Sequence, residues 1–171
     1  MITFLRTSVF AAACGLLLAS PAYAATVPGT DYLPAALACQ GALPAFAGTL
    51  RARPLALQNE GSADAFATCG GIGNDTGYRT ITEVSVRLVN QNENAGPVTV
   101  SCTMVVGFGG GSPPIYSTKS VSLVFGLTNS LVWVPADFGF PYIPWPQVSC
   151  QLPPGTGIHY MRTEYNINVG A

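Results

Sequence analysis

The stretch VTVSCTMVV, residues 98–106, alternates apolar side chains with small hydroxyl side chains. One set of alternate positions holds Val98, Val100, Cys102, Met104 and Val106, and the other holds Thr99, Ser101 and Thr103. This period of two is typical of a β-strand that buries one face in a core and presents the other to water. The stretch therefore predicts a strand of an antiparallel sheet, with Cys102 directed inward.

The same alternation recurs on both sides of this strand. It occurs at 83–88, 120–125, 147–152 and 158–169, and weaker candidate strands lie at 48–58, broken at Pro54, at 62–69 and at 130–134. Residues 83–88 and 98–106 are expected to pair as a hairpin across the polar turn 90–97. A 3.6-residue period is missing after residue 24. The pattern therefore predicts an all-β antiparallel sandwich of eight or nine strands, with jelly-roll and immunoglobulin-like strand orders both open.

Residues 1–24 have the pattern of a secretory signal peptide. Met1 to Arg6 carries one positive charge, residues 8–18 are small and apolar, and Ala22-Tyr23-Ala24 provides the small residues of a cleavage site. The apolar run is too short to span a bilayer, which needs roughly 20 residues. We expect cleavage after Ala24, an irregular lead-in over residues 25–47 pinned by Cys39, and a sandwich domain over residues 48–171.

The predicted mature chain keeps 147 of the 171 residues, which is the size of one domain. It carries six basic and eight acidic side chains, since Arg6 is removed with the signal peptide. This balance disfavours nucleic acid and anionic membranes as partners. A second long apolar segment is also missing, so we expect no transmembrane segment. The predicted location is the medium, the periplasm or the cell surface.

Four cysteines remain after cleavage, namely Cys39, Cys69, Cys102 and Cys150. An even number in an exported chain predicts two disulfides, for which sequence alone allows three connectivities. Cys102 and Cys150 each share parity with apolar neighbours, which favours a bridge between these two across the core and leaves Cys39 with Cys69. The cysteines form no C-x-x-C pair and the chain has one histidine, so neither a zinc site nor a cofactor is expected.

Three segments resemble a group of exported bacterial proteins of unknown function. They are TCGG (68–71), VSCTMV (100–105) and VSCQLPPGTGI (148–158), followed by a tyrosine. Proteins of that group carry a cysteine-containing β-sandwich directly after the signal peptide. The resemblance implies the fold and the cysteine framework, and it implies no activity.

Catalytic residues are not evident in the sequence. His159 shares parity with Met161 and Tyr165, whereas Arg162 and Glu164 fall on the opposite face, and no G-x-S-x-G nucleophile motif occurs. The glycine-rich GNDTG, residues 73–77, offers only Asn74 and Asp75 to a calcium ion, so no metal site is expected. The chain is therefore expected not to be an enzyme. The alternative is a secreted hydrolase that uses its scattered carboxylates.

The segment WVPADFGFPYIPWPQ, residues 133–147, is the best functional candidate. It holds both tryptophans of the chain among four prolines, which favour a surface loop over a central strand. The candidate ligand-binding residues are Trp145, Tyr142, Phe140 and Phe138, because exposed rigid aromatic rings stack on sugars and anchor protein partners. Trp133 shares parity with Leu131 and is expected in the core. In the alternative interpretation, the rings fold back and plug one end of the sandwich.

These observations predict an exported, non-enzymatic binding or structural module that contacts polysaccharide or a surface protein through the loop. An inhibitor of a foreign enzyme, acting through the same rigid loop, is the other alternative.

Overall fold

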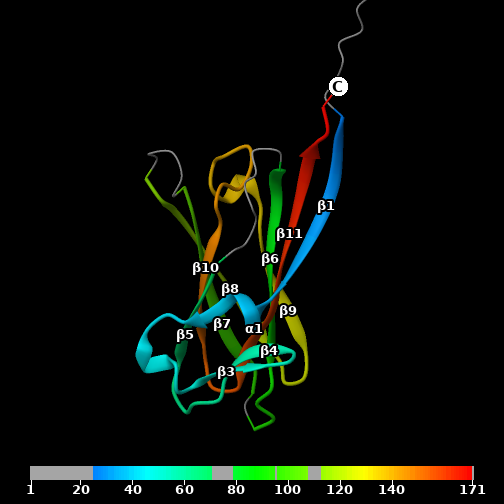
Figure 1. The fold of residues 1–171 in the computed structure, drawn as a ribbon. Helices are drawn as coiled ribbons and strands as arrows, with labels where there is room; N and C mark the ends of the chain where they lie inside the picture. Colours follow the sequence, from blue (N-terminus) through cyan, green and yellow to red (C-terminus); the bar gives the residue numbers. More distant parts are fainter. Residues whose placement is uncertain (1–24, 71–78, 95, 108–112, 171) are drawn as a thin grey trace, which may run out of the picture.

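The computed structural model describes residues 25–70, 79–94, 96–107 and 113–170 as an antiparallel β-sandwich, which confirms the predicted fold class (Figure 1). Within these residues eleven strands form two sheets, two more strands than the upper expectation. The six-stranded sheet has the order β3-β4-β11-β6-β9, with β1 also paired to β11. The five-stranded sheet has the order β2-β5-β10-β7-β8.

The elements have the following bounds. The six-stranded sheet comprises β1 (Thr26–Pro34), β3 (Leu50–Arg53), β4 (Ala56–Asn59), β6 (Arg79–Asn90), β9 (Thr128–Trp133) and β11 (Thr156–Asn168). The five-stranded sheet comprises β2 (Cys39–Gly41), β5 (Ala65–Cys69), β7 (Val98–Val106), β8 (Ile115–Leu123) and β10 (Gln147–Leu152). The short helices are α1 (Ala35–Ala38), η1 (Pro44–Phe46) and η2 (Pro135–Asp137).

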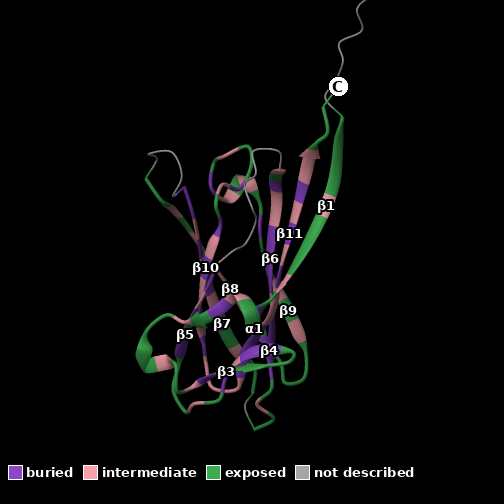
Figure 2. Ribbon diagram, viewed as in Figure 1, coloured by how far each residue is buried: buried purple, intermediate pink, exposed green. Residues whose placement is uncertain are grey.

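The core lies between the inner faces of the two sheets (Figure 2). Strand β7 buries Val100, Cys102, Met104 and Val106, as its alternation predicts. From the facing sheet, β6 contributes Val84, Val86 and Leu88. Burial of such a side chain contributes about 1.5–3 kcal/mol relative to exposure, so the alternating strands hold the two layers together.

The predicted hairpin between residues 83–88 and 98–106 is wrong. Strand β6 pairs with β11 and β9, whereas β7 pairs with β10 and β8, so the two strands belong to different sheets. The turn between them therefore crosses from one layer of the sandwich to the other. Alternation reveals which face of a strand is buried, but a neighbour in the same sheet and a partner across the core produce the same pattern.

The lead-in over residues 25–47 is more regular than expected, because it contains β1 and β2. Strand β1 pairs with β11 over its whole length, from Thr26 opposite Asn168 to Pro34 opposite Tyr160. All nine of its residues are exposed or half-buried, so it lacks the apolar alternation that marks a core strand. The ring of Tyr165 fills the space beside Gly29, where an added Cβ would lie 2.4 Å from Cε2 of that ring.

Both predicted disulfides are present, Cys39–Cys69 and Cys102–Cys150. Each joins residues directly opposite one another on neighbouring strands, β2 with β5 and β10 with β7. The expectation that Cys102–Cys150 crosses the core is therefore corrected, because the bridge lies within the five-stranded sheet and only faces the core. Parity predicts that both sulfur atoms face the core, but it does not distinguish a disulfide between the two sheets from one between neighbouring strands of the same sheet.

Residues 48–58 form a hairpin rather than one strand, with β3 and β4 on either side of Pro54. Strand β3 is an edge of its sheet, where a nearby proline is tolerated. Among the described residues, no helix has the length and apolar character that crossing a membrane requires.

Candidate functional site

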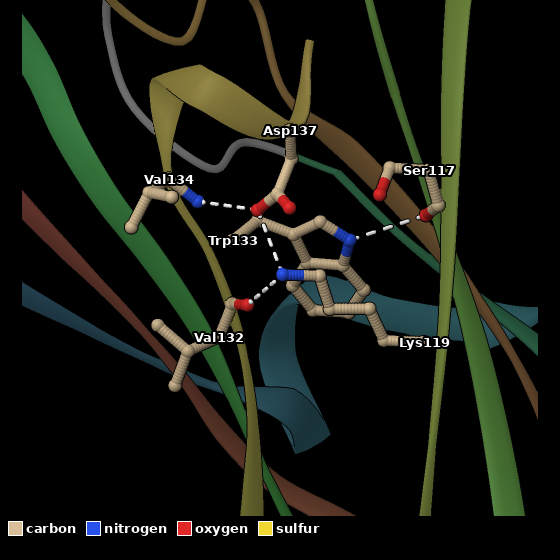
Figure 3. A network of polar contacts seen from close by, with 6 residues as sticks. All are labelled: Ser117, Lys119, Val132, Trp133, Val134 and Asp137. Atoms are coloured by element: carbon tan, nitrogen blue, oxygen red, sulfur yellow. Dashed lines mark hydrogen bonds and ion pairs between the residues drawn. The ribbon is translucent and has the colours of Figure 1, made fainter.

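The aromatic loop, residues 133–147, begins at a tryptophan that joins the two sheets. Trp133 is the last residue of β9 and is completely buried, as its parity predicts. Its indole Nε1 donates a hydrogen bond to the carbonyl oxygen of Ser117 on β8, at 3.1 Å (Figure 3). Because β8 and β9 are edge strands of different sheets, this contact closes the sandwich beside the base of the loop.

A lysine network fixes the next turn of the loop. The Lys119 ammonium on β8 donates to Asp137 Oδ2 and to the carbonyl oxygen of Val132, both at 2.7 Å (Figure 3). Asp137 Oδ2 also accepts the backbone N–H of Val134 at 2.8 Å. Burial alone would raise the pKa of the Asp137 carboxyl, but the hydrogen bonds from Lys119 and Val134 together outweigh it and hold this pKa below its ordinary value. Helix η2 is thus attached to both sheets.

The four predicted ligand-binding aromatics divide into buried and exposed residues. Phe138 is only 5% exposed and belongs to the core, and Phe140 is half-buried against it. Tyr142 and Trp145 are each 43% exposed. Phe138 is therefore removed from the binding candidates, because an ordered core ring offers no face to a ligand. Part of the loop does plug the sandwich, and the other part presents two rings to solvent.

Between these two exposed aromatic residues in the chain lies Ile143, which is buried. Its side chain is 1% exposed, and its N–H donates to the carbonyl oxygen of Ile81 on β6 at 3.0 Å. Sequence reasoning ranked residues here by aromatic character alone and overlooked this aliphatic anchor. Ile143 anchors the loop near its C-terminal end, so Tyr142 and Trp145 lie beside a fixed point.

Trp145 has an unusual backbone. Its φ is +48°, and it is the only non-glycine residue with positive φ in the described part of the chain. The left-handed region costs an L-residue roughly 1–2 kcal/mol, so the surrounding structure must impose it. Pro144 and Pro146 flank it, Pro146 is buried, and the Pro144 carbonyl oxygen accepts the N–H of Gly107 at 3.4 Å. The indole is consequently presented by a restrained backbone.

The loop leads directly into the outer face of the five-stranded sheet, a feature that sequence analysis missed as a site. Hydroxyl side chains cover this face on four neighbouring strands, and we call them the hydroxyl face. They are Thr68, Thr99, Ser101, Thr103, Thr118, Ser120, Ser122 and Ser149. The sequence showed their alternation on each strand separately, but not that the strands lie side by side in one sheet.

A hollow of about 350 Å³ opens at the β2 edge of the same sheet. Gln40, Thr68 and Gln147 contribute polar side chains to it, and Leu37 forms part of its rim. Gln40 pairs with Thr68 in the register of β2 and β5, and Thr68 pairs with Ser149 on β10. The hollow is therefore continuous with the hydroxyl face.

The acidic side chains proposed for a hydrolase are mostly neutralised by neighbouring basic groups. Asp31 pairs with Arg79, Glu60 with Arg53, and Asp137 with Lys119. Glu83 and Glu164 lie opposite each other on β6 and β11, but both contact the guanidinium of Arg162 between them. Asp75 lies outside the described residues, as does the whole GNDTG segment. Within the described residues, no group of three or more potential metal ligands is present.

His159 lies at an irregularity in β11, which changes the predicted parity. The register with β6 shifts between Ile158 and Tyr160, so Ile158 and Met161 are both buried although they are three positions apart, an odd spacing that would put them on opposite faces of a regular strand. His159 is half-buried and does not share the buried face of Met161, contrary to the expectation. Partial burial lowers the pKa of its imidazole, and the positive charge of Arg87 lowers it further.

Comparison with known proteins gives similarity in structure only. No protein-family model matches the sequence, and a search of curated proteins also finds no match. Among solved structures, the C-terminal CBM6 of LamC, a marine laminarinase from Zobellia galactanivorans, is 11% identical with a TM-score of 0.45. The alignment covers 79% of this chain and 98% of that one.

Two further structures are of different kinds. An empty head of Turnip Yellow Mosaic Virus is 11% identical with a TM-score of 0.45, over 100% of this chain and 89% of that chain. TmCBM61, solved in complex with β-1,4-galactotriose, is 8% identical with a TM-score of 0.36, over 81% of this chain and 88% of that chain.

Proposed function

We propose that the protein is an exported, non-enzymatic binding module of bacterial origin that contacts polysaccharide through Trp145 and Tyr142. The observation that carries this proposal is the display of Trp145, which combines an exposed ring with the single positive φ among described non-glycine residues. Backbone strain of this kind persists where the surrounding structure imposes it, and it is found at ligand contacts.

The restraint of the loop supports binding rather than passive exposure. Ordering a flexible side chain and loop on association costs affinity, and a ring already held by its backbone avoids part of that cost. Lys119 holds η2 at one end of the loop, and Ile143 is buried near the other. The aromatic pair therefore meets a ligand with little further ordering.

Export is proposed from the signal-peptide pattern of residues 1–24 together with the two disulfides, which persist in oxidising compartments. Export suits the proposed ligand, because polysaccharides of cell walls and matrices lie outside the cell. Five of the seven described side-chain carboxylates are ion-paired, which supports a non-catalytic role over the hydrolase alternative, since a general acid or base needs a group free to exchange a proton.

Affinity electrophoresis of the purified mature protein through gels that contain soluble polysaccharides tests this function. The wild type should be retarded by at least one polysaccharide, and Trp145→Ala should weaken that binding by about 1–3 kcal/mol, roughly five- to 150-fold in Kd. Tyr142→Ala should weaken it as well. Both variants should keep the wild-type melting temperature, because their rings are exposed.

Phe125→Ala is the matched control. Phe125 is 47% exposed, similar to Trp145, but it lies in the turn before β9, whereas the aromatic loop follows β9. Its loss should leave retardation unchanged. Equal effects of Trp145→Ala and Phe125→Ala, or no retardation by any polysaccharide in the panel, would contradict the proposed function.

A further inference from the structure

Charge is distributed unequally between the two sheets. The strands of the six-stranded sheet carry Asp31, Arg51, Arg53, Arg79, Glu83, Arg87, Arg162 and Glu164. The strands of the five-stranded sheet, all of which are described, carry one charged residue, Lys119. Lys119 does not point outward, because its ammonium contacts Val132 and Asp137 on the neighbouring sheet and the following turn (Figure 3). The strand residues of the outer face are therefore uncharged, and the charge beside them is a carboxylate, since Asp64 just before β5 accepts the side-chain amide of Gln151 at 2.7 Å.

The hydroxyl face is ordered in rows that run across the strands. One row joins Thr68, Ser149, Thr103 and Thr118 on β5, β10, β7 and β8. Thr103 and Thr118 share a hydrogen bond of 2.8 Å between their Oγ1 atoms, and Thr68 donates to Ser149 at 3.4 Å. In the next row, Ser101 and Ser120 share a bond of 2.7 Å. Strand geometry separates successive rows by about 7 Å.

These pairs orient the hydroxyl groups without exhausting them. A hydroxyl has one donor and two acceptor positions, so the Thr103–Thr118 and Ser101–Ser120 pairs each keep a free proton and free lone pairs for a ligand. Ser149 donates its own proton to the carbonyl oxygen of Ala67 at 3.3 Å, so the Thr68–Ser149 pair offers lone pairs only. The pairing fixes rotors that would otherwise have to be ordered on binding. The face thus offers donors and acceptors at fixed spacing, and the hydroxyl rows themselves hold no charged group whose desolvation a ligand would have to offset.

Apolar and polar groups frame this array. Another row across the strands runs from Tyr116 on β8 through Val105 on β7 to Gln147 on β10, and Tyr116 at its end is 63% exposed. Gln147 follows Trp145 by two residues in the chain. Phe66 on β5, which is 42% exposed, lies opposite Gln151 on β10. The hollow lined by Gln40, Thr68 and Gln147 lies along the β2 edge. Rings near the borders and hydroxyls in the centre suit a ligand with both apolar ring faces and many hydroxyl groups.

From this arrangement we infer that the hydroxyl face is an extended binding surface for an uncharged polysaccharide, which continues from the Trp145 loop across the five-stranded sheet. The inference rests on the proposed function and specifies its ligand as neutral. An anionic polysaccharide would find no cation on this face to balance its charge. A protein partner would find few of the large apolar side chains that form the centre of a protein interface.

The test introduces charge into the face. Thr118 and Ser120 are exposed on the edge strand β8, so the double variant Thr118→Glu/Ser120→Glu should retain the wild-type fold, checked by melting temperature. Affinity electrophoresis would use neutral amylose, xylan, galactan and mixed-linkage β-glucan, and anionic alginate and polygalacturonate. We expect retardation of the wild type by at least one neutral polysaccharide and by neither anionic one. The double glutamate variant should bind tenfold more weakly or worse.

Two variants serve as controls. Thr80→Glu places a single glutamate, half the charge added by the double variant, at an exposed threonine on β6 in the other sheet, and it should bind as the wild type does. Thr118→Ala/Ser120→Ala removes the hydroxyls without adding charge and should weaken binding by at least threefold. This second variant still tests the face if the glutamates disturb the strand.

The outcomes separate the two proposals. If Trp145→Ala abolishes neutral polysaccharide binding while both β8 double variants bind normally, the hydroxyl face is not part of the site, and the proposed function stands. If the β8 variants lose binding and Trp145→Ala does not, the face is the site and the loop is not. Binding of alginate or polygalacturonate at equal strength overturns the neutral specificity. Failure to bind any polysaccharide overturns both proposals.

Discussion

Individual residues in the aromatic loop have separate structural and surface roles. Trp133 and Trp145 lie twelve positions apart in the same aromatic, proline-rich segment, yet one is completely buried and the other 43% exposed. Parity along β9 was enough to predict the burial of Trp133, because Leu131 precedes it on the same face. The burial of Phe138 could not be predicted, since it follows η2, where strand parity no longer applies.

Replacement of Trp133 by alanine should destabilise the fold by about 3–5 kcal/mol, as expected for a buried aromatic residue. It removes the ring from the core and also the hydrogen bond that joins the two sheets at Ser117. Chemical denaturation monitored by circular dichroism would measure this loss. Trp145→Ala is the control and should unfold at nearly the wild-type denaturant concentration. Equal destabilisation by both variants would mean that the loop is entirely a plug.

Asp137→Asn should lower stability by about 1 kcal/mol at neutral pH, a value typical of a partly exposed charge-assisted hydrogen bond. The folded-state pKa of Asp137 lies below its unfolded value, so its contribution is complete above the unfolded pKa. The contribution is lost as pH falls through the folded pKa. The difference between wild type and variant should therefore begin to shrink as the pH falls below about 4, the unfolded value, and it should disappear only below the folded pKa. Unfolding curves from pH 7 to pH 3 would show this convergence, and a constant difference would contradict it.

At the scale of strands, alternation identified the buried faces correctly but could not identify the neighbours. The bounds of β10 agree with the prediction, and β7 was predicted in full. The pairing of β6 with β7 was wrong because each strand buries the same kind of face toward the same core. Strand β1 was missed because a largely exposed strand that pairs along one edge leaves no apolar pattern.

The double variant Cys102→Ala/Cys150→Ala should lose about 4 kcal/mol, the chain-entropy value for a loop closed over a sequence separation of 48. Both residues are replaced, so no free thiol is left in the core. Chemical denaturation of the variant and of the wild type measures the difference in their free energies of unfolding. Peptide mapping of the wild type without reduction should recover a peptide that links Cys102 to Cys150. A peptide that links Cys39 to Cys102 would refute the strand arrangement.

For the whole molecule, the alternation of apolar and polar residues predicted the fold class, whereas composition was a poor guide to the site. The low charged fraction, 9%, was visible in the sequence, but its consequence depends on where the charges gather. The structure gathers nearly all strand charges on one sheet, and only the strand order reveals that the other is neutral. A candidate site made of serines and threonines also has no motif, because each residue is ordinary on its own strand.

The mature protein should begin at Ala25. Intact-mass spectrometry of material exported by a bacterial host would detect a chain shorter by residues 1–24, with two disulfides and no free thiol. This start would place the new N-terminus next to β1, which is fully formed from Thr26. An exported protein that retained residues 1–24 would refute the signal-peptide interpretation.

The pairing of β1 with β11 brings residues 25 and 170 together. The N–H of Ala25 donates to the Gly170 carbonyl oxygen at 3.3 Å, and the N–H of Val169 donates to the Ala25 carbonyl oxygen at 3.0 Å. A short glycine-serine bridge could therefore join these two positions, and the chain could be reopened at the exposed turn 124–127 between β8 and β9. Such a circular permutant would keep every strand pair of the sandwich. Its new termini, where a fusion partner would be attached, would lie at the Thr128 end of β9 instead of beside β1 and β11.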